Sequence, residues 1–232
     1  MTRRAGSRAR VDKPGTIIPA DAPLEVRGSD IPFVSRGGLK LDAALSHWEI
    51  NVTDRMAVDI GASTGGFTDC LLQRGAARVV ALDVGHGLLD ATLRADPRVE
   101  VIERVNARHL PRDLFREPFD LVTVDVSFIS ATKVAPALLS HVAPGGLLLV
   151  LVKPQFEAER RSVGRGGVLR DETARREVVA RRAEEIAALG FSALGLFDSP
   201  VAGAEGNRET FALFRRPAAA APAPSAAAGA GA

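Results

Sequence analysis

Lysine is scarce in this chain, and two of its four lysines stand where a reaction could use them. Lys and Arg together number 30, and only Lys13, Lys40, Lys133 and Lys153 are lysines. Arginine stays charged at any accessible pH, whereas the lysine amine is a compact charge that can gain or lose a proton. Lys153 directly follows the apolar run LLLVLV, and Lys40 lies in SRGGLKL. Both are candidates for chemistry, although for Lys40 alone chance in an Arg-rich sequence is the simpler interpretation.

Two carboxylates are expected at the same place as these lysines. Asp125 ends the apolar run LVTVD and Lys153 ends the next run, so both should emerge at the carboxyl edge of a parallel sheet. Glu209 starts the last apolar run, and an antiparallel strand would begin at this same edge. Lys40 belongs to a helix just before the first run. The order Lys40, Asp125, Lys153, Glu209 therefore predicts one cluster, and the alternative is two unrelated surface ion pairs, which contribute little.

The stretch AVDIGASTGGFTD, residues 57–69, indicates a ligand-binding turn between a strand and a helix. Gly61 permits a sharp turn, and Gly65 and Gly66 permit a ligand to approach the backbone closely. The stretch is neither a P-loop, which needs a Gly-Lys-Ser/Thr ending, nor a dinucleotide motif, because Ser63 occupies a glycine position. Asp59, before the turn, favours a cationic or amino-bearing ligand over a pyrophosphate.

A second acid extends this pattern towards a nucleoside-containing cofactor. Asp83 ends the second run, in ALDVGHG, where an acid typically binds ribose hydroxyls. Acid, glycine turn and second acid together fit S-adenosylmethionine, and Asn106 could line the adenine side or serve the local backbone. For Asp59 and Asp83 the alternative is helix capping. The predicted cofactor residues are Asp59, Gly61, Ser63, Thr64, Gly65, Gly66, Phe67, Asp83, Asn106 and Asp125.

Hydrophobic periodicity predicts the elements that position these residues. Short, β-branched apolar runs occupy 57–60, 79–83, 99–102, 121–125, 147–152, 192–197 and 210–214. Helical periodicity marks 39–47, 68–74, 131–141 and 172–189. Apolar strands that alternate with helices indicate a doubly wound α/β domain with a mostly parallel seven-stranded sheet. The last two runs lack a helix between them, which predicts an antiparallel final strand.

Composition divides the chain into three parts and excludes several classes of protein. Residues 1–33 are rich in Pro, Gly and Arg, residues 34–216 carry the predicted domain, and residues 217–232 are an Ala/Pro/Gly tail expected to be disordered. No apolar run is long enough to span a membrane, and no secretory signal is present, so a cytoplasmic protein is expected. Cys70 is the single cysteine, at a core-like helical position, and no metal site is predicted.

Several motifs together resemble a known family. The tetrad Lys40, Asp125, Lys153 and Glu209 resembles that of ribose 2′-O-methyltransferases of the FtsJ/RrmJ type. The blocks SRGGLKL, DIGASTGGFTD, ALDVGHGLL, VDVSFIS, LVKPQFE, GRGGVLRD and GNRE resemble the TlyA family of ribosomal RNA methyltransferases, also described as haemolysins. Residues 11–26 resemble the end of the family's S4-type RNA-binding domain, so residues 1–33 would be a remnant of that domain.

The resemblance implies a Rossmann-like, class I S-adenosylmethionine-dependent methyltransferase that acts on ribosomal RNA or ribosomal subunits. Lys153 would accept the proton of the ribose hydroxyl or orient that hydroxyl, and these two roles stay open. Lys40 would position the substrate or stabilise the developing alkoxide, and Asp125 and Glu209 would hold the lysines. Neither a metal nor stable membrane insertion is expected, and the sequence leaves the oligomeric state open. The alternatives are a catalytically weakened cofactor-binding and RNA-binding protein, or a haemolysin-type activity.

Overall fold

The computed structural model describes residues 17–19, 21–22, 31–158, 163–164, 166–203 and 206–218 of the 232-residue chain. The chain divides into two compact units, residues 1–30 and residues 31–232. The five described residues of the first unit carry no helix or strand. The S4-type remnant therefore stays a prediction, and the predicted disordered tail lies outside the described residues from residue 219 onwards.

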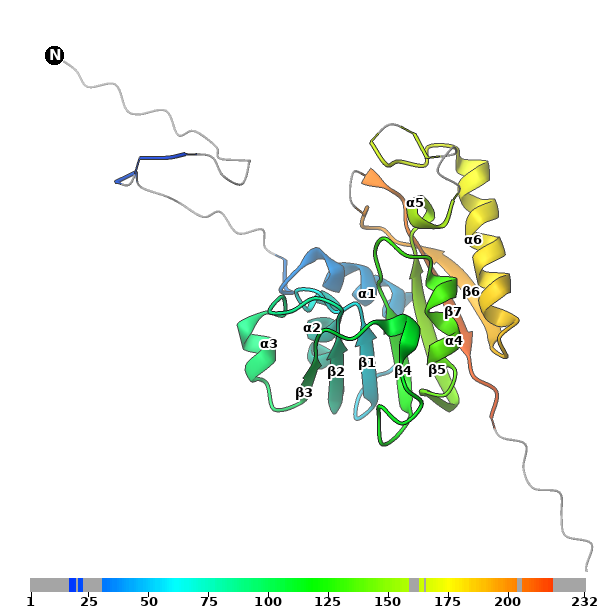
Figure 1. The fold of residues 1–232 in the computed structure, drawn as a ribbon, viewed down its shortest axis with the longest axis horizontal. Helices are drawn as coiled ribbons and strands as arrows, with labels where there is room; N and C mark the ends of the chain where they lie inside the picture. The colour runs from blue at the N-terminus through cyan, green and yellow to red at the C-terminus, as the bar shows by residue number, and fades with distance from the viewer. Residues whose placement is uncertain are drawn as a thin grey trace, which may run out of the picture. The chain divides into compact units, whose positions relative to one another are not determined.

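The second unit contains a seven-stranded sheet with the order β3-β2-β1-β4-β5-β7-β6 (Figure 1). The strands are β1 (Met56–Ile60), β2 (Arg78–Leu82), β3 (Val99–Ile102), β4 (Phe119–Val124), β5 (Val142–Val152), β6 (Ser192–Asp198) and β7 (Thr210–Arg215). The pairings among β1 to β5 are parallel, and β7 pairs antiparallel with both β5 and β6. The predicted mostly parallel sheet with an antiparallel final strand is confirmed.

Helices cover both faces of the sheet because successive strand residues point to opposite sides. The principal helices are α1 (Arg36–His47), α2 (Gly66–Gln73), α4 (Ala135–Leu138) and α6 (Glu172–Ala187). Along β1, Val58 and Ile60 join an apolar cluster that also holds residues of α4 and α6. Ala57 joins a second cluster that holds residues of α1 and α2. This two-sided burial is what makes the strands almost continuously apolar in the sequence.

Several short elements depart from the prediction. The single helix expected over residues 131–141 is instead η2 (Ala131–Lys133) followed by α4, which begins with a proline in its first turn. Pro136 lies in the first turn of α4, where its missing N–H costs no intrahelical hydrogen bond, so α4 begins there as a separate element after η2. Three further short elements were not predicted from the sequence: α3 (Ala91–Ala95), η1 (Ala107–His109) and α5 (Pro154–Glu157).

Register places the predicted chemical residues at one edge of the sheet. Ile60 pairs with Val124, so the chain after β1 lies beside the chain after β4. Val152 pairs with Thr210 in the antiparallel β5–β7 pair, so the end of β5 lies beside the start of β7.

Cys70 is fully buried in α2, and burial raises the pKa of its thiol to about 12, which confirms a core role.

Candidate active site

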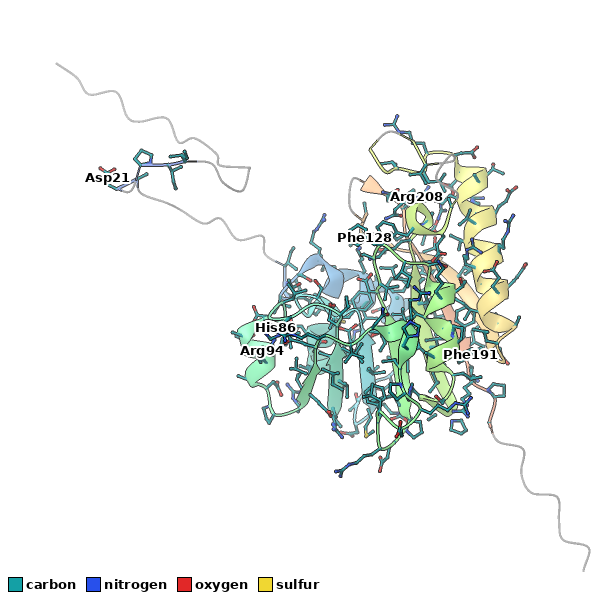
Figure 2. The ribbon with its side chains drawn as sticks, viewed as in Figure 1. Asp21, His86, Arg94, Phe128, Phe191 and Arg208 are labelled. Atoms are coloured by element: carbon teal, nitrogen blue, oxygen red, sulfur yellow. The ribbon has the colours of Figure 1, made fainter. Side chains whose placement is uncertain are left out.

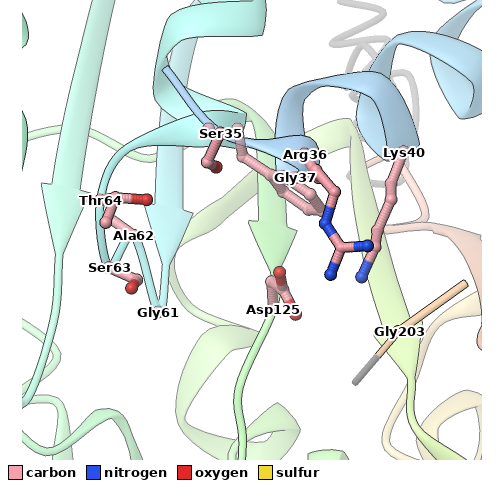
Figure 3. Close-up of a pocket in the computed structure, with 12 residues that line it drawn as sticks. Ser35, Arg36, Gly37, Lys40, Gly61, Ala62, Ser63, Thr64, Asp125 and Gly203 are labelled. Atoms are coloured by element: carbon pink, nitrogen blue, oxygen red, sulfur yellow. The ribbon is translucent and has the colours of Figure 1, made fainter. Parts of the chain in front are cut away.

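A cavity of about 250 Å³ opens at the carboxyl edge of the sheet. Its lining residues come from the first turn of α1, the loop after β1, the end of β4 and the loop before β7: Ser35, Arg36, Gly37, Lys40, Gly61, Ala62, Ser63, Thr64, Gly66, Phe67, Asp125 and Gly203. Figure 3 shows the side chains of Arg36 and Lys40 reaching from α1 towards the space beside Asp125. Doubly wound sheets bind their ligands at this edge.

The cavity contains six of the ten residues that the sequence predicted to bind a cofactor, namely Gly61, Ser63, Thr64, Gly66, Phe67 and Asp125. Gly65 lies outside it, at the N-cap of α2 with a φ of 98°. A Cβ on Gly65 would stand 2.3 Å from the side chain of Leu93. Backbone conformation and packing therefore require glycine at this position, which is a different reason from the ligand approach that the sequence suggested.

Gly61 brings the ends of β1 and β4 into close contact. Its φ is 87°, and a Cβ would stand 2.5 Å from the carbonyl oxygen of Asp125. The amide of Asp125 in turn donates to the carbonyl of Ile60 at 2.9 Å. Only glycine adopts this conformation without strain and leaves room for the neighbouring backbone. The turn therefore sets the position of Asp125 relative to the cavity.

The side chain of Asp59 hydrogen-bonds to the first turn of α2 and does not line the cavity. Its side chain is fully buried and accepts hydrogen bonds from the amide of Thr68 at 3.0 Å and from the Thr68 hydroxyl at 2.8 Å. Gly65, the N-cap of α2, has no side chain to satisfy that amide, so Asp59 provides the acceptor. The interpretation that Asp59 meets a cationic ligand is therefore corrected in favour of the capping alternative.

Asp83 accepts hydrogen bonds from both the loop after β1 and the loop after β2. Its Oδ2 accepts from the amide of Ser63 at 2.8 Å, and its Oδ1 accepts from the amide of Gly85 at 2.7 Å. An ionised carboxylate keeps further lone pairs, so ribose binding by Asp83 stays a prediction.

Asn106 is exposed, and its Oδ1 accepts from the amide of Arg108 at 3.0 Å, which caps η1. Its adenine role also stays a prediction.

Lys40 and Glu209 form a buried ion pair beside the cavity. The Lys40 ammonium donates to Glu209 Oε2 at 2.6 Å, and the two side chains are 11% and 2% exposed. Gly203 closes over this pair, because a Cβ on it would stand 2.1 Å from Glu209 Oε1. At this degree of burial a charge without a partner would strongly destabilise the fold, so both charges must stay paired. Glu209 thus fixes the Lys40 ammonium at the cavity wall.

Lys153 forms the second pair, with Asp125 and with a serine whose place in the sequence indicates a different role. Its ammonium lies 2.7 Å from Asp125 Oδ1 and donates to Ser127 Oγ at 2.9 Å. Ser127 and Ser130 both precede the helical segment that starts at residue 131, and a serine in such a place typically caps the helix. Ser130 does so, since its hydroxyl accepts from the amide of Thr132, but Ser127 contacts Lys153 instead. One member of each lysine–carboxylate pair, Lys40 and Asp125, thus lines the same cavity, while the catalytic roles of the four residues stay predictions.

Other residues at this site carry little signal in the sequence. Arg36 lines the cavity one helical turn before Lys40, and only its place in SRGGLKL could have indicated it. Phe128 is 91% exposed and has a φ of 65°, an unusual conformation for a bulky residue (Figure 2). Its ring centroid lies 5.2 Å from that of Phe156. Phe128 therefore presents an aromatic face beside Asp125 and Ser127.

The described part of the chain shows neither a cluster of metal ligands nor a membrane-spanning helix. Among residues 17–19, 21–22, 31–158, 163–164, 166–203 and 206–218, no group of three or more His, Cys, Asp or Glu side chains could hold a metal ion. Within the same ranges no helix is long and apolar enough to cross a membrane.

The donor set at the cavity fits S-adenosylmethionine. The glycine-rich loop lies along one wall with the hydroxyls of Ser63 and Thr64, and the carboxylates of Asp83 and Asp125 lie at the ends of β2 and β4. A solved S-adenosylmethionine-dependent methyltransferase from Mesorhizobium loti shares the fold, with a TM-score of 0.54 at 16% identity over 75% of this chain and 96% of that one. Fold and site together place this chain in the class of doubly wound α/β proteins that bind a ligand at the carboxyl edge of the sheet.

The comparisons with known proteins identify the family. The FtsJ-like methyltransferase family matches residues 33–216, and the chain belongs to that family. It is 46% identical over 207 residues to the 16S/23S rRNA (cytidine-2′-O)-methyltransferase TlyA of Mycobacterium tuberculosis, covering 88% of this chain and 76% of that one. A solved hemolysin-type structure from Streptococcus thermophilus has a TM-score of 0.78 at 42% identity, over 82% of this chain and 70% of that chain. The resemblance found in the motifs is confirmed.

Proposed function

We propose that this chain transfers the methyl group of S-adenosylmethionine to a ribose 2′-hydroxyl of ribosomal RNA. The observation that carries the proposal is that two lysine–carboxylate pairs, Lys40 with Glu209 and Lys153 with Asp125, each contribute one member, Lys40 and Asp125, to the wall of one cavity. The name of the relative from Mycobacterium tuberculosis, a cytidine-2′-O-methyltransferase of rRNA, supports this substrate. A ribosomal substrate would also place the chain in the cytoplasm.

The residues at this edge suit a reaction in which a hydroxyl is the nucleophile. The cofactor supplies a methyl group that its sulfonium has already activated, so the chain must align the hydroxyl and manage one proton. Lys153 can orient the hydroxyl by a hydrogen bond or, in its neutral form, accept the proton. Lys40 places a fixed positive charge in the cavity lining, where it would stabilise negative charge that develops on the oxygen. Asp125 and Glu209 hold the two ammonium groups.

Two side chains offer features that an RNA strand would use. Phe128, three residues after Asp125, exposes an aromatic ring on which an unstacked base can lie, and base–aromatic stacking is common in recognition of single-stranded RNA. Arg36 brings a guanidinium to the cavity lining, where a phosphate would be its natural partner. These two residues support a nucleic-acid substrate over a small molecule.

The decisive experiment compares Lys153→Ala with a matched lysine variant. Purified wild-type chain, Lys153→Ala and Lys133→Ala would be incubated with radiolabelled S-adenosylmethionine and unmodified ribosomal subunits or rRNA. Lys133 is exposed on η2 and lies outside the cavity lining, so its removal controls for loss of one positive charge. We expect label in a 2′-O-methylated nucleotide for the wild type and Lys133→Ala, and none for Lys153→Ala.

Cofactor binding separates the possible outcomes. Isothermal titration should give the same affinity for S-adenosylmethionine in Lys153→Ala as in the wild type, because Lys153 does not line the cavity. Full methyl transfer by Lys153→Ala would overturn its assigned role. Cofactor binding by a wild-type chain that labels no RNA would indicate the rival function, a cofactor-binding protein that is catalytically weakened.

A further inference from the structure

The segment of residues 125–131, called here the 125–131 loop, is held by both ends of the short helix α5. At the start of α5, Lys153 is the N-cap residue, and its ammonium contacts Asp125 Oδ1 at 2.7 Å and Ser127 Oγ at 2.9 Å. The Lys153 side chain is only 11% exposed, so its ammonium makes these two contacts in a largely buried place.

At the other end of α5, a buried glutamate holds the second half of the same loop. Glu157 is 6% exposed, and its Oε1 accepts from the amide of Ala131 at 2.7 Å. Its Oε2 accepts from the hydroxyl of Ser130 at 2.5 Å and lies 3.1 Å from Arg182 Nε of α6. The loop is therefore fixed to α5 at two points, and the position of Ser127 between them is constrained.

We propose that Ser127 is a positioning residue for Lys153, and this inference rests on the proposed function of the site. An ammonium has three N–H groups and no acceptor. The ammonium donates a hydrogen bond to Ser127 Oγ, whereas its 2.7 Å contact with Asp125 Oδ1 is an ion pair without hydrogen-bond geometry. Ser127 is therefore the acceptor that fixes the direction of one N–H and, with it, the orientation of the ammonium. With Asp125 alone, the ammonium would be free to rotate about a single contact. Ser127 therefore aims another N–H, or the lone pair of the neutral amine, at the substrate oxygen.

The serine hydroxyl suits this role better than a second carboxylate would. A neutral acceptor holds the ammonium without adding negative charge beside Asp125, whose charge already faces the cofactor cavity. Ser127 is itself exposed and contributes no lining atom to the cavity, so its removal should leave the cofactor site intact. The effect of a substitution should therefore appear in the chemical step.

The kinetic test compares Ser127→Ala and Ser127→Thr with Ser140→Ala, which removes an exposed hydroxyl in the turn after α4. Single-turnover methyl transfer would be measured at saturating cofactor and RNA. We expect Ser127→Ala to lower the rate by about tenfold with the KM for RNA and the Kd for S-adenosylmethionine unchanged. Ser127→Thr, which keeps the oxygen, should recover the rate to within about threefold, and Ser140→Ala should match the wild type.

A second measurement does not depend on methyl-transfer activity. The scarcity of lysine allows each amine to be followed by mass spectrometry after brief acetylation, with the exposed Lys133 as internal reference. We expect Lys153 to be acetylated several-fold faster, relative to Lys133, in Ser127→Ala than in the wild type. Ser127→Thr and Ser140→Ala should keep the wild-type ratio. The melting temperature of each variant checks that the fold is retained.

The outcomes separate this inference from the proposed function. Faster acetylation of Lys153 in a chain whose wild type labels no rRNA would support the positioning role and overturn the proposed function. An unchanged acetylation ratio would overturn the positioning role, whatever the activity. A raised KM for RNA with an unchanged single-turnover rate would also overturn it, because Ser127 would then act as an RNA contact.

Discussion

The buried carboxylate of Asp59 should make the stability of this protein depend on pH in an unusual direction. Burial, together with the smaller effect of the nearby charge of Asp125, raises the pKa of Asp59 from 3.8 to about 7, against the hydrogen bonds from Thr68 and Thr123 that lower it. A raised pKa means that the folded state binds the proton more tightly than the unfolded state. The contribution of Asp59 to stability is therefore greatest below about pH 4 and declines as pH rises towards 7.

The magnitude follows from the size of the shift. Each pKa unit corresponds to about 1.4 kcal/mol, so the contribution of Asp59 should fall by about 4 kcal/mol over the whole window, and by roughly 3 kcal/mol between about pH 5 and about pH 8. Asp59→Asn should abolish this dependence. The asparagine oxygen can still accept from Thr68, and its NH₂ can donate to the Thr123 hydroxyl, which lies 3.3 Å from Asp59 Oδ1.

The assay is denaturant unfolding of the wild type and Asp59→Asn across this pH range. The free energy of unfolding of the wild type minus that of the variant should fall by roughly 3 kcal/mol from about pH 5 to about pH 8. Asp120→Asn is the control, since Asp120 is an aspartate of the same sheet whose side chain is 40% exposed. A difference between wild type and Asp59→Asn that stays constant with pH would refute the reasoning.

Three further substitutions test the geometry around the cavity. Gly203→Ala would place a Cβ 2.1 Å from Glu209 Oε1, and displacement of that carboxylate should lower methyl transfer at least about tenfold, measured as the single-turnover rate. Glu209→Ala leaves the ammonium of Lys40 buried without a partner and should lower the free energy of unfolding by about 3 kcal/mol in denaturant titration. Gly61→Ala would put an alanine at a φ of 87°, with its Cβ 2.5 Å from the carbonyl oxygen of Asp125. This variant should lower the free energy of unfolding by about 1–3 kcal/mol and should bind the cofactor more weakly, as measured by calorimetry. If any of these variants behaved like the wild type, the packing argument from which its loss is predicted would be contradicted.

Local sequence was enough to predict the fold class and the edge at which the site lies. Apolar runs and helical periodicity predicted all seven strands and most of the long helices, because burial on both faces leaves a pattern that near neighbours reveal. The polar residues that end those runs, Asp125 and Lys153, mark the carboxyl edge. The single helix expected over residues 131–141 was wrong, because Pro136 begins a second, separate helix within a stretch whose apolar periodicity is continuous.

Tertiary structure decided which partner each side chain takes. Lys40 and Glu209 are 169 positions apart, and Lys153 and Ser127 are 26 apart, so no local pattern could pair them. The sequence by itself determined the residue types that this protein brings to its cavity and the strand ends from which they emerge. Only the packed fold decided that Asp59 turns inward to cap a helix and that Ser127 turns to Lys153, because a hydrogen-bonding side chain takes the nearest unsatisfied partner that the fold presents.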